Sequence, residues 1–161
     1  MRSLAASVCV VALIALGSGT GLARPVAQGR LGSVTPREYR LIVAINAVRA
    51  SHLLPKLGID ARLVSAARSH SRDMLRRHYF AHGNFGGRMA LFHVRGTRFA
   101  ENLVWSSGVM SGNEAVAQWL TSPPHRQNLL DPNLRRVGVA TPVGAFDGFS
   151  TATMITADFA G

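Results

Sequence analysis

The sequence predicts an α+β fold, a single domain in which helices cover a small sheet. Helical periodicity with recognisable capping residues dominates the chain up to about residue 131. Two β-rich runs follow, at 136–142 and 150–159, and the turn between them contains glycine and aspartate, which is a hairpin signal. Helices followed by an antiparallel hairpin favour α+β over an alternating α/β arrangement.

The first 23 residues have the layout of a secretory signal peptide. A positive start is followed by an almost unbroken apolar run at 4–16 and by small residues before a cut after Ala23. This run is shorter than the roughly 20 residues of a spanning helix, and a retained anchor is the alternative. Residues 24–34 are expected to form a flexible lead-in, and 35–161 the domain. No later segment reaches transmembrane length, so we expect a secreted protein, extracellular or periplasmic.

Cysteine content and charge limit the kinds of site and partner that the protein can have. Cys9 is the only cysteine and would leave with the signal peptide, so no disulfide or cysteine metal site is expected. The chain carries a formal charge of +10, and removing Arg2 leaves 17 basic against 8 acidic side chains. Such a surface associates with anionic polymers or membranes. The arginines are scattered and no basic motif interleaved with aromatics is present, so we expect no nucleic-acid partner.

Two long helices are predicted, at about 36–52 and 60–78. The capping box TPRE opens the first at Thr35, where threonine and glutamate satisfy each other's backbone N–H groups. Asp60 is the expected N-cap of the second helix. His70 lies in the apolar stripe of that helix, so a hydrogen-bonded core histidine is favoured over a ligand.

The middle of the chain is predicted to pass from a loop to a strand and then to short helices. Residues 79–97 are rich in glycine and aromatics and predict a loop, whereas FAENLVW at 99–105 predicts a strand. A second capping box, SGNE, opens a short helix at Ser111. Ser122 is the expected cap of the next helix, which should end before Pro132.

The signatures of several common enzyme classes are absent from the sequence. It has no GxSxG, GxxxxGK, GxGxxG or HExxH motif. What remains is His82, Glu101 and His125. A buried carboxylate is strongly destabilising unless it is paired, and two histidines would be natural partners for Glu101. They would serve either as hydrogen-bond donors or, with Glu101, as ligands of Zn²⁺ or another divalent metal. Spacing alone does not show that the three meet.

Seven segments in this order resemble the bacterial branch of the CAP superfamily. They are NAVRA at 46–50, ARSHSRDM at 67–74, FAH at 80–82, ENL at 101–103, WLTSPPHRQNLL at 119–130, VGV at 137–139 and DF at 158–159. The family is also called the SCP domain, and it includes cysteine-rich secretory proteins, antigen 5 and pathogenesis-related proteins. The resemblance covers about residues 38–161, nearly all of the expected mature chain.

The resemblance implies an α-β-α sandwich, with a small antiparallel sheet between helical layers. It also implies a cleft lined by two histidines and two acids. By motif, His82 and His125 match the histidines, and Glu101 matches the glutamate. The family pattern Trp-x-x-Glu becomes Trp119-x-x-Ser122 here, so a serine stands where relatives keep the second acid. This departure weakens any mechanism that needs two carboxylates.

The expected function is a secreted, non-enzymatic ligand-binding module with a His/Glu cleft. Its ligand is unknown: the resemblance implies a sterol or lipid, a peptide or cell-wall component is a further candidate, and anionic envelope surfaces are another expected partner. The cleft is expected to comprise His82, Glu101, Ser122 and His125. The candidate metal ligands are His82, Glu101 and His125. The alternative is a hydrolase of peptides, esters or cell wall, in which bound metal activates water or His125 acts as a base.

Overall fold

The computed structural model describes residues 34–161. The expected signal peptide, 1–23, and all of the expected lead-in except residue 34 therefore lie outside the described residues. Across the described part, no helix has both the length and the apolar character needed to cross a membrane.

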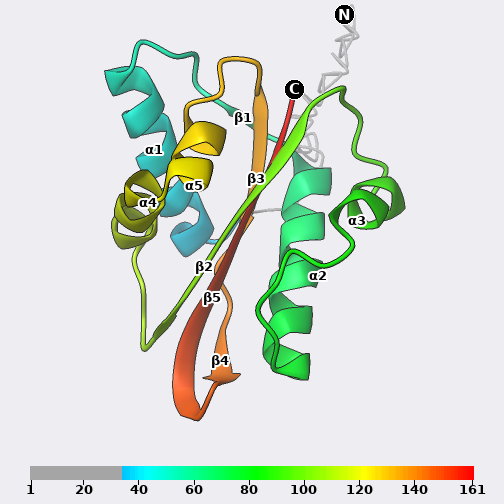
Figure 1. Ribbon diagram of the computed structural model, residues 1–161, viewed down its shortest axis with the longest axis vertical. Coiled ribbons are helices and arrows are strands. Elements are labelled where there is room, and N and C mark those ends of the chain that lie inside the picture. The colour runs from blue at the N-terminus through cyan, green and yellow to red at the C-terminus, as the bar shows by residue number, and fades with distance from the viewer. Residues whose placement is uncertain (1–33) are drawn as a thin grey trace, which may run out of the picture.

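The described residues form three layers, which confirms the expected α+β sandwich (Figure 1). One layer contains α1 (Pro36–Ser51), α4 (Gly112–Thr121) and α5 (Pro123–Leu129), and the opposite layer contains α2 (Ala61–Arg77) and α3 (Phe85–Leu91). The sheet between them consists of β1 (Gly58–Ile59), β2 (Phe99–Ser107), β3 (Arg136–Ala140), β4 (Val143–Phe146) and β5 (Phe149–Ala160).

The sheet is built around the long strand β5. Its order is β1-β3-β5-β2, and β4 pairs with β5 beyond the end of β3. All pairs are antiparallel except β1 with β3, which is a two-residue parallel pair that the sequence analysis missed. The predicted antiparallel pairing of the two C-terminal runs is confirmed as β3 with β5, and β4 lies between them in the chain.

Local capping chemistry starts three of the helices as expected. Thr35 and Ser111 both form complete capping boxes, and the carboxylate of Asp60 accepts from the first turn of α2. Ser122 does not behave as predicted. It occupies the N-cap position of α5, but its side chain makes no capping hydrogen bond. Two prolines at the start of α5 leave fewer free N–H groups there, so the helix needs its cap less.

The predicted loop at 79–97 contains the seven-residue helix α3. Asn84 caps this helix, and its side chain accepts from the backbone N–H of Gly87. Two adjacent glycines, Gly86 and Gly87, lower the intrinsic helix propensity and hid the element. The position of α3 is important because it presents Arg88 to the sheet.

A buried arginine fixes the helical layer that contains α1. Arg49, near the end of α1, is fully buried and donates to four backbone carbonyls, those of Pro55, Leu129, Asp131 and Leu134. A buried guanidinium is tolerated only when its donors are satisfied. This accounts for the arginine of the NAVRA segment as a structural residue that joins α1 to the α5–β3 connection.

Candidate functional site

Glu101 lies at the centre of a buried cluster of charged and polar side chains on β2. Its side chain is only 2% exposed. One carboxylate oxygen, Oε1, lies 2.7 Å from Nδ1 of His82. The other, Oε2, accepts from the guanidinium of Arg88, which reaches across from α3. Both oxygens of this carboxylate are therefore engaged by protein donors, as expected for a carboxylate that is almost fully buried.

Two further titratable groups complete the cluster. Asp158 lies directly opposite Glu101 in the β2–β5 register and is completely buried. His70, on α2, places Nε2 at 3.8 Å from Oε2 of Glu101. The guanidinium of Arg88 is 3.9 Å from Oδ1 of Asp158. The cluster thus combines residues from α2, the α2–α3 connection, α3 and two neighbouring strands.

Burial sets the protonation of the two innermost groups. It raises the pKa of Asp158 well above its ordinary value, and the negative charge of Glu101 raises it further. Burial also lowers the pKa of His70, helped by the positive charge of Arg88 and opposed by Glu101. Burial thus disfavours the charged forms of both Asp158 and His70, which flank the ion pair of Glu101 with Arg88.

Several buried polar atoms of the cluster lack a hydrogen-bond partner within residues 34–161. They are Nε2 of His70, Nε of Arg88 and both carboxyl oxygens of Asp158. Unsatisfied groups of this kind are rare in folded proteins and commonly mark functional sites or ordered water. The polar groups of this cluster are buried, but not all of them are hydrogen-bonded. Arg49 differs, because it donates hydrogen bonds to four backbone carbonyls.

His125 lies on α5, in the opposite helical layer from His70 and Arg88. Its backbone carbonyl accepts from the amide of Asn102, and neighbouring strand residues such as Glu101 and Asn102 point to opposite faces. Burial and the nearby His82 both lower the pKa of His125. Across 34–161, no hydrogen bond or ion pair joins its ring to His82 or Glu101.

The structure brings together only part of the predicted metal set. Among the described residues, no group of three or more His, Cys, Asp or Glu side chains is arranged to hold a metal ion. His82 and Glu101 are in contact, but Arg88 already supplies a cation to the second oxygen of the carboxylate. The donor set as arranged does not fit a metal ion, and the ligand role of His82, Glu101 and His125 stays a prediction.

Ser122 lies partly buried where α4 passes into α5. Within the part of the chain that the structure describes, its hydroxyl makes no hydrogen bond to His125. The place of Ser122 in the cleft remains a prediction.

Sequence reasoning missed two members of the cluster and the position of a third. His70 is buried and hydrogen-bonds the backbone at Ala81, as expected of a core histidine. Its Nε2, which faces Glu101 without a hydrogen bond, was not foreseen. Arg88 lies in the segment that was predicted to be a loop, and no sequence pattern there identified it as a partner of Glu101. Asp158 belongs to the DF segment, and the strand register that sets it against Glu101 was its only signal.

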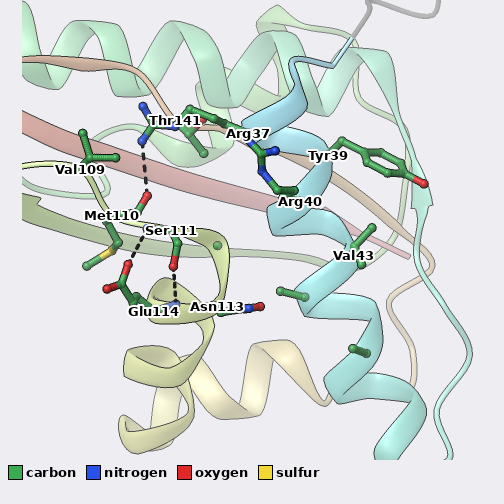
Figure 2. A pocket seen from close by; sticks show the side chains of 13 residues that line it. Arg37, Tyr39, Arg40, Val43, Val109, Met110, Ser111, Asn113, Glu114 and Thr141 are labelled. Carbon is green, nitrogen blue, oxygen red and sulfur yellow. Dashed lines mark hydrogen bonds between the residues drawn. The ribbon is translucent and has the colours of Figure 1, made fainter.

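A cavity lies away from this cluster, between α1 and the segment that leads into α4 (Figure 2). It has a volume of about 640 Å³ and a predominantly apolar lining. Figure 2 shows Tyr39, Arg40 and Val43 on the α1 side, with Val109 and Met110 on the opposite side. We call this cavity the α1–α4 groove.

Comparisons with known proteins match this architecture. The chain matches the CAP model, that of the cysteine-rich secretory protein family, over residues 42–158. It is 33% identical over 112 residues to the Bacillus subtilis protein YkwD, a match covering 66% of this chain and 43% of YkwD. The chain thus spans less than half the length of this curated relative.

Solved structures show the same fold. An extracellular SCP-domain protein from Bacillus anthracis superposes with a TM-score of 0.62 at 27% identity, covering 80% of this chain and 44% of that one. An outer surface protein from Borrelia burgdorferi superposes with a TM-score of 0.60 at 22% identity, covering 79% of this chain and 94% of that one. Because the family match spans most of the chain and the three-layer fold agrees with it, the protein belongs to the CAP, or cysteine-rich secretory protein, family.

Proposed function

We propose that the protein is a secreted, non-enzymatic module that binds a single-chain amphiphile, with its apolar chain in the α1–α4 groove. One observation carries this proposal: large apolar side chains that are exposed to water gather there. Tyr39 is 55% exposed, Val43 49% and Val109 70%. An exposed apolar patch that lines a cavity is typical of a ligand site.

The rim of the groove suits an anionic head group. Arg37 and Arg40 both line it, and Arg37 also donates to the backbone carbonyl of Met110. Glu114 is the single acidic side chain of the lining, and it is held by the capping box of Ser111. Cationic side chains above an apolar channel complement a carboxylate or phosphate on a hydrocarbon chain.

The environment of Glu101 argues against this carboxylate as the catalytic base. Each of its oxygens is already engaged by a protein donor, and the side chain is almost inaccessible to a substrate. A general base must lie within hydrogen-bond reach of the proton that it removes. His82, which is 56% exposed, is the member of the cluster best placed to contact a ligand at the surface. His125 is the corresponding candidate on the other helical layer.

Secretion is part of the proposal. It is supported by the predicted leader at 1–23 and by the likeness to one protein described as extracellular and another described as an outer surface protein.

A fluorescence titration with cis-parinaric acid tests the groove. In Val43→Asp, a charge at the apolar wall should weaken binding at least about tenfold, since desolvating a carboxylate beside the chain is costly. Val143→Asp is the matched control, because Val143 is 41% exposed but lies on β4, outside the groove lining. It should bind within about twofold of the wild type. Absence of saturable binding by the wild type, or equal affinity in both variants, would contradict the proposal.

A further inference from the structure

We propose that a groove between α2 and α3 binds a linear phosphodiester polymer with small polyol linkers. Two adjoining cavities of about 740 and 440 Å³ form this groove, and they share Ser69, Arg76 and Phe92 in their linings. We call it the arginine groove. It lies on the opposite side of the sheet from the α1–α4 groove (Figure 1), and the proposal does not rest on the amphiphile site.

The arginine groove follows the outward face of α2. The inward face of this helix packs on the sheet through fully buried side chains such as Leu63, Ala67 and Met74. The outward face presents Arg68, Arg72 and Arg76 at four-residue spacing, all lining the groove. Four residues of α-helix rise about 6 Å, so the guanidinium groups form a regular row along the helix axis.

The groove has an excess of positive charge. Five arginines line it, namely Arg68, Arg72, Arg76, Arg77 and Arg88, against the single carboxylate of Asp73. Glu38 pairs with Arg68 and Glu101 with Arg88 from outside the lining. Counting these two carboxylates as well, a net charge of +2 is left for a ligand to neutralise.

The central arginines are free to exchange partners. Arg76 and Arg77 both bind Asp73, and their side chains are 73% and 68% exposed. Ion pairs this exposed contribute little to stability, so an incoming anion displaces them readily. Arg72 is exposed and has no ion pair within the described part of the chain. Arg68, at the start of the row, and Arg88, on α3, are by contrast held by buried carboxylates and serve as fixed charges of the groove.

The length of the row favours a polymer over a single small anion. From Arg68 to Arg77 the helix advances about 14 Å. One phosphate group contacts one or two guanidinium groups, whereas a chain with repeated phosphates neutralises several at once. Arginine also suits phosphate better than lysine does, because its planar fork donates two parallel hydrogen bonds.

The aromatic residues beside the groove favour a polymer without bases. Nucleic-acid grooves without sequence preference use open aromatic faces on which bases stack. Here the guanidinium of Arg77 covers the ring of Tyr79 at 5.6 Å, and that of Arg88 covers Phe85 at 5.4 Å. The remaining apolar surface is Phe92, half-buried, with the exposed Leu91 beside it. That surface accommodates the methylene groups of a polyol linker.

Binding of a fluorescently labelled poly(glycerol phosphate) of defined length, followed by anisotropy, tests the inference. Arg72→Gln with Arg76→Gln should weaken binding about tenfold and reduce the slope of log K against log[salt] by about 1.4, as two lost phosphate contacts require. Lys56→Gln with Arg126→Gln is the control, since both residues are exposed, neither lines the groove, and the net charge changes equally. It should bind within about twofold of the wild type.

Three results would overturn the inference. Equal weakening in both double variants would assign binding to net charge alone, and no binding by the wild type would remove the site. The third result is that oligothymidylate or polyglutamate with the same number of charges binds more tightly than poly(glycerol phosphate). That result would assign the groove to a nucleic acid or to a carboxylate polymer, respectively. The Arg72→Gln, Arg76→Gln variant should still bind cis-parinaric acid as the wild type does, which separates this site from the α1–α4 groove.

Discussion

Asp158 is the residue whose environment departs most from what a carboxyl group prefers. It is completely buried, and neither of its oxygens has a hydrogen-bond partner in the described residues. Glu101 on β2 adds a negative charge beside it, while Arg88 on α3 provides the nearest cation, and His70 on α2 is neutral. Keeping the proton avoids a second buried charge, so folding raises the pKa of Asp158 and favours its protonated form.

This protonation predicts a pH-dependent effect of Asp158→Asn. The folded-state pKa of Asp158 lies above its unfolded value, so its contribution to wild-type stability is complete below about pH 4 and is lost as pH rises through the folded pKa. Asparagine does not titrate. Between about pH 4 and the folded-state pKa of Asp158, the variant should therefore gain stability relative to the wild type by up to about 1.4 kcal/mol per pH unit. Urea unfolding at about pH 4, 5, 6 and 7 measures the difference, and parallel pH profiles would argue against a protonated Asp158.

At this scale the sequence predicted only part of the candidate site. The contact of His82 with Glu101 is among the interactions that the sequence analysis considered, and the structure has it. Arg88 could not be predicted as a partner of Glu101, because it reaches the carboxylate from α3. The two adjacent glycines of α3 made that segment resemble a loop. Ser122 was also expected to cap α5, and its side chain makes no capping hydrogen bond, while the cleft role that its motif position implied stays a prediction.

Helix α2 is the element that connects the buried cluster to the surface. Its inner face supplies His70 to Glu101, and its outer face carries the arginine row. It packs closely on the sheet at Gly138 of β3, where a Cβ would lie 2.1 Å from the backbone of Leu63 and Val64. The glycine of the VGV segment is therefore needed for close approach rather than for backbone conformation.

Gly138→Ala should push α2 away from β3. Overpacking of a close contact typically costs about 1–3 kcal/mol, and here the atoms met are backbone atoms that cannot rotate away. We therefore expect a loss of at least about 2 kcal/mol in the free energy of unfolding. Gly86→Ala is the control, since a Cβ there meets nothing within 4 Å. It should leave stability unchanged or raise it by up to about 1 kcal/mol, because alanine favours helix. Chemical denaturation measures both, and an unperturbed Gly138→Ala would refute the close-contact account.

Elements with local signals were predictable, and those that depend on distant partners were not. The capping boxes at Thr35 and Ser111 are each encoded within four residues, and both are present. β1 consists of two residues, and it is a strand only because Gly58 and Ile59 pair with β3, which lies far along the chain. No local pattern announces a strand of that kind.

The molecule as a whole presents two different surfaces on opposite sides of one sheet. The α1–α4 groove is apolar with a cationic rim, and the arginine groove is polar and basic. The sequence predicted the family, the fold and the excess of positive charge, but not where that charge collects. Four of the five groove arginines lie on α2, three of them at four-residue spacing, and the packing of α3 beside α2 adds Arg88 to them.

The central claim is that the protein binds an amphiphile without converting it. Native mass spectrometry after prolonged incubation with palmitoyl lysophosphatidylglycerol, a single-chain anionic ester, tests both parts of the claim at once. The account predicts a one-to-one complex that carries the intact lipid, because the apolar groove accepts the chain while the carboxylate of Glu101 is engaged and almost inaccessible. Failure to form a complex, or release of palmitate that Glu101→Gln abolishes, would contradict it.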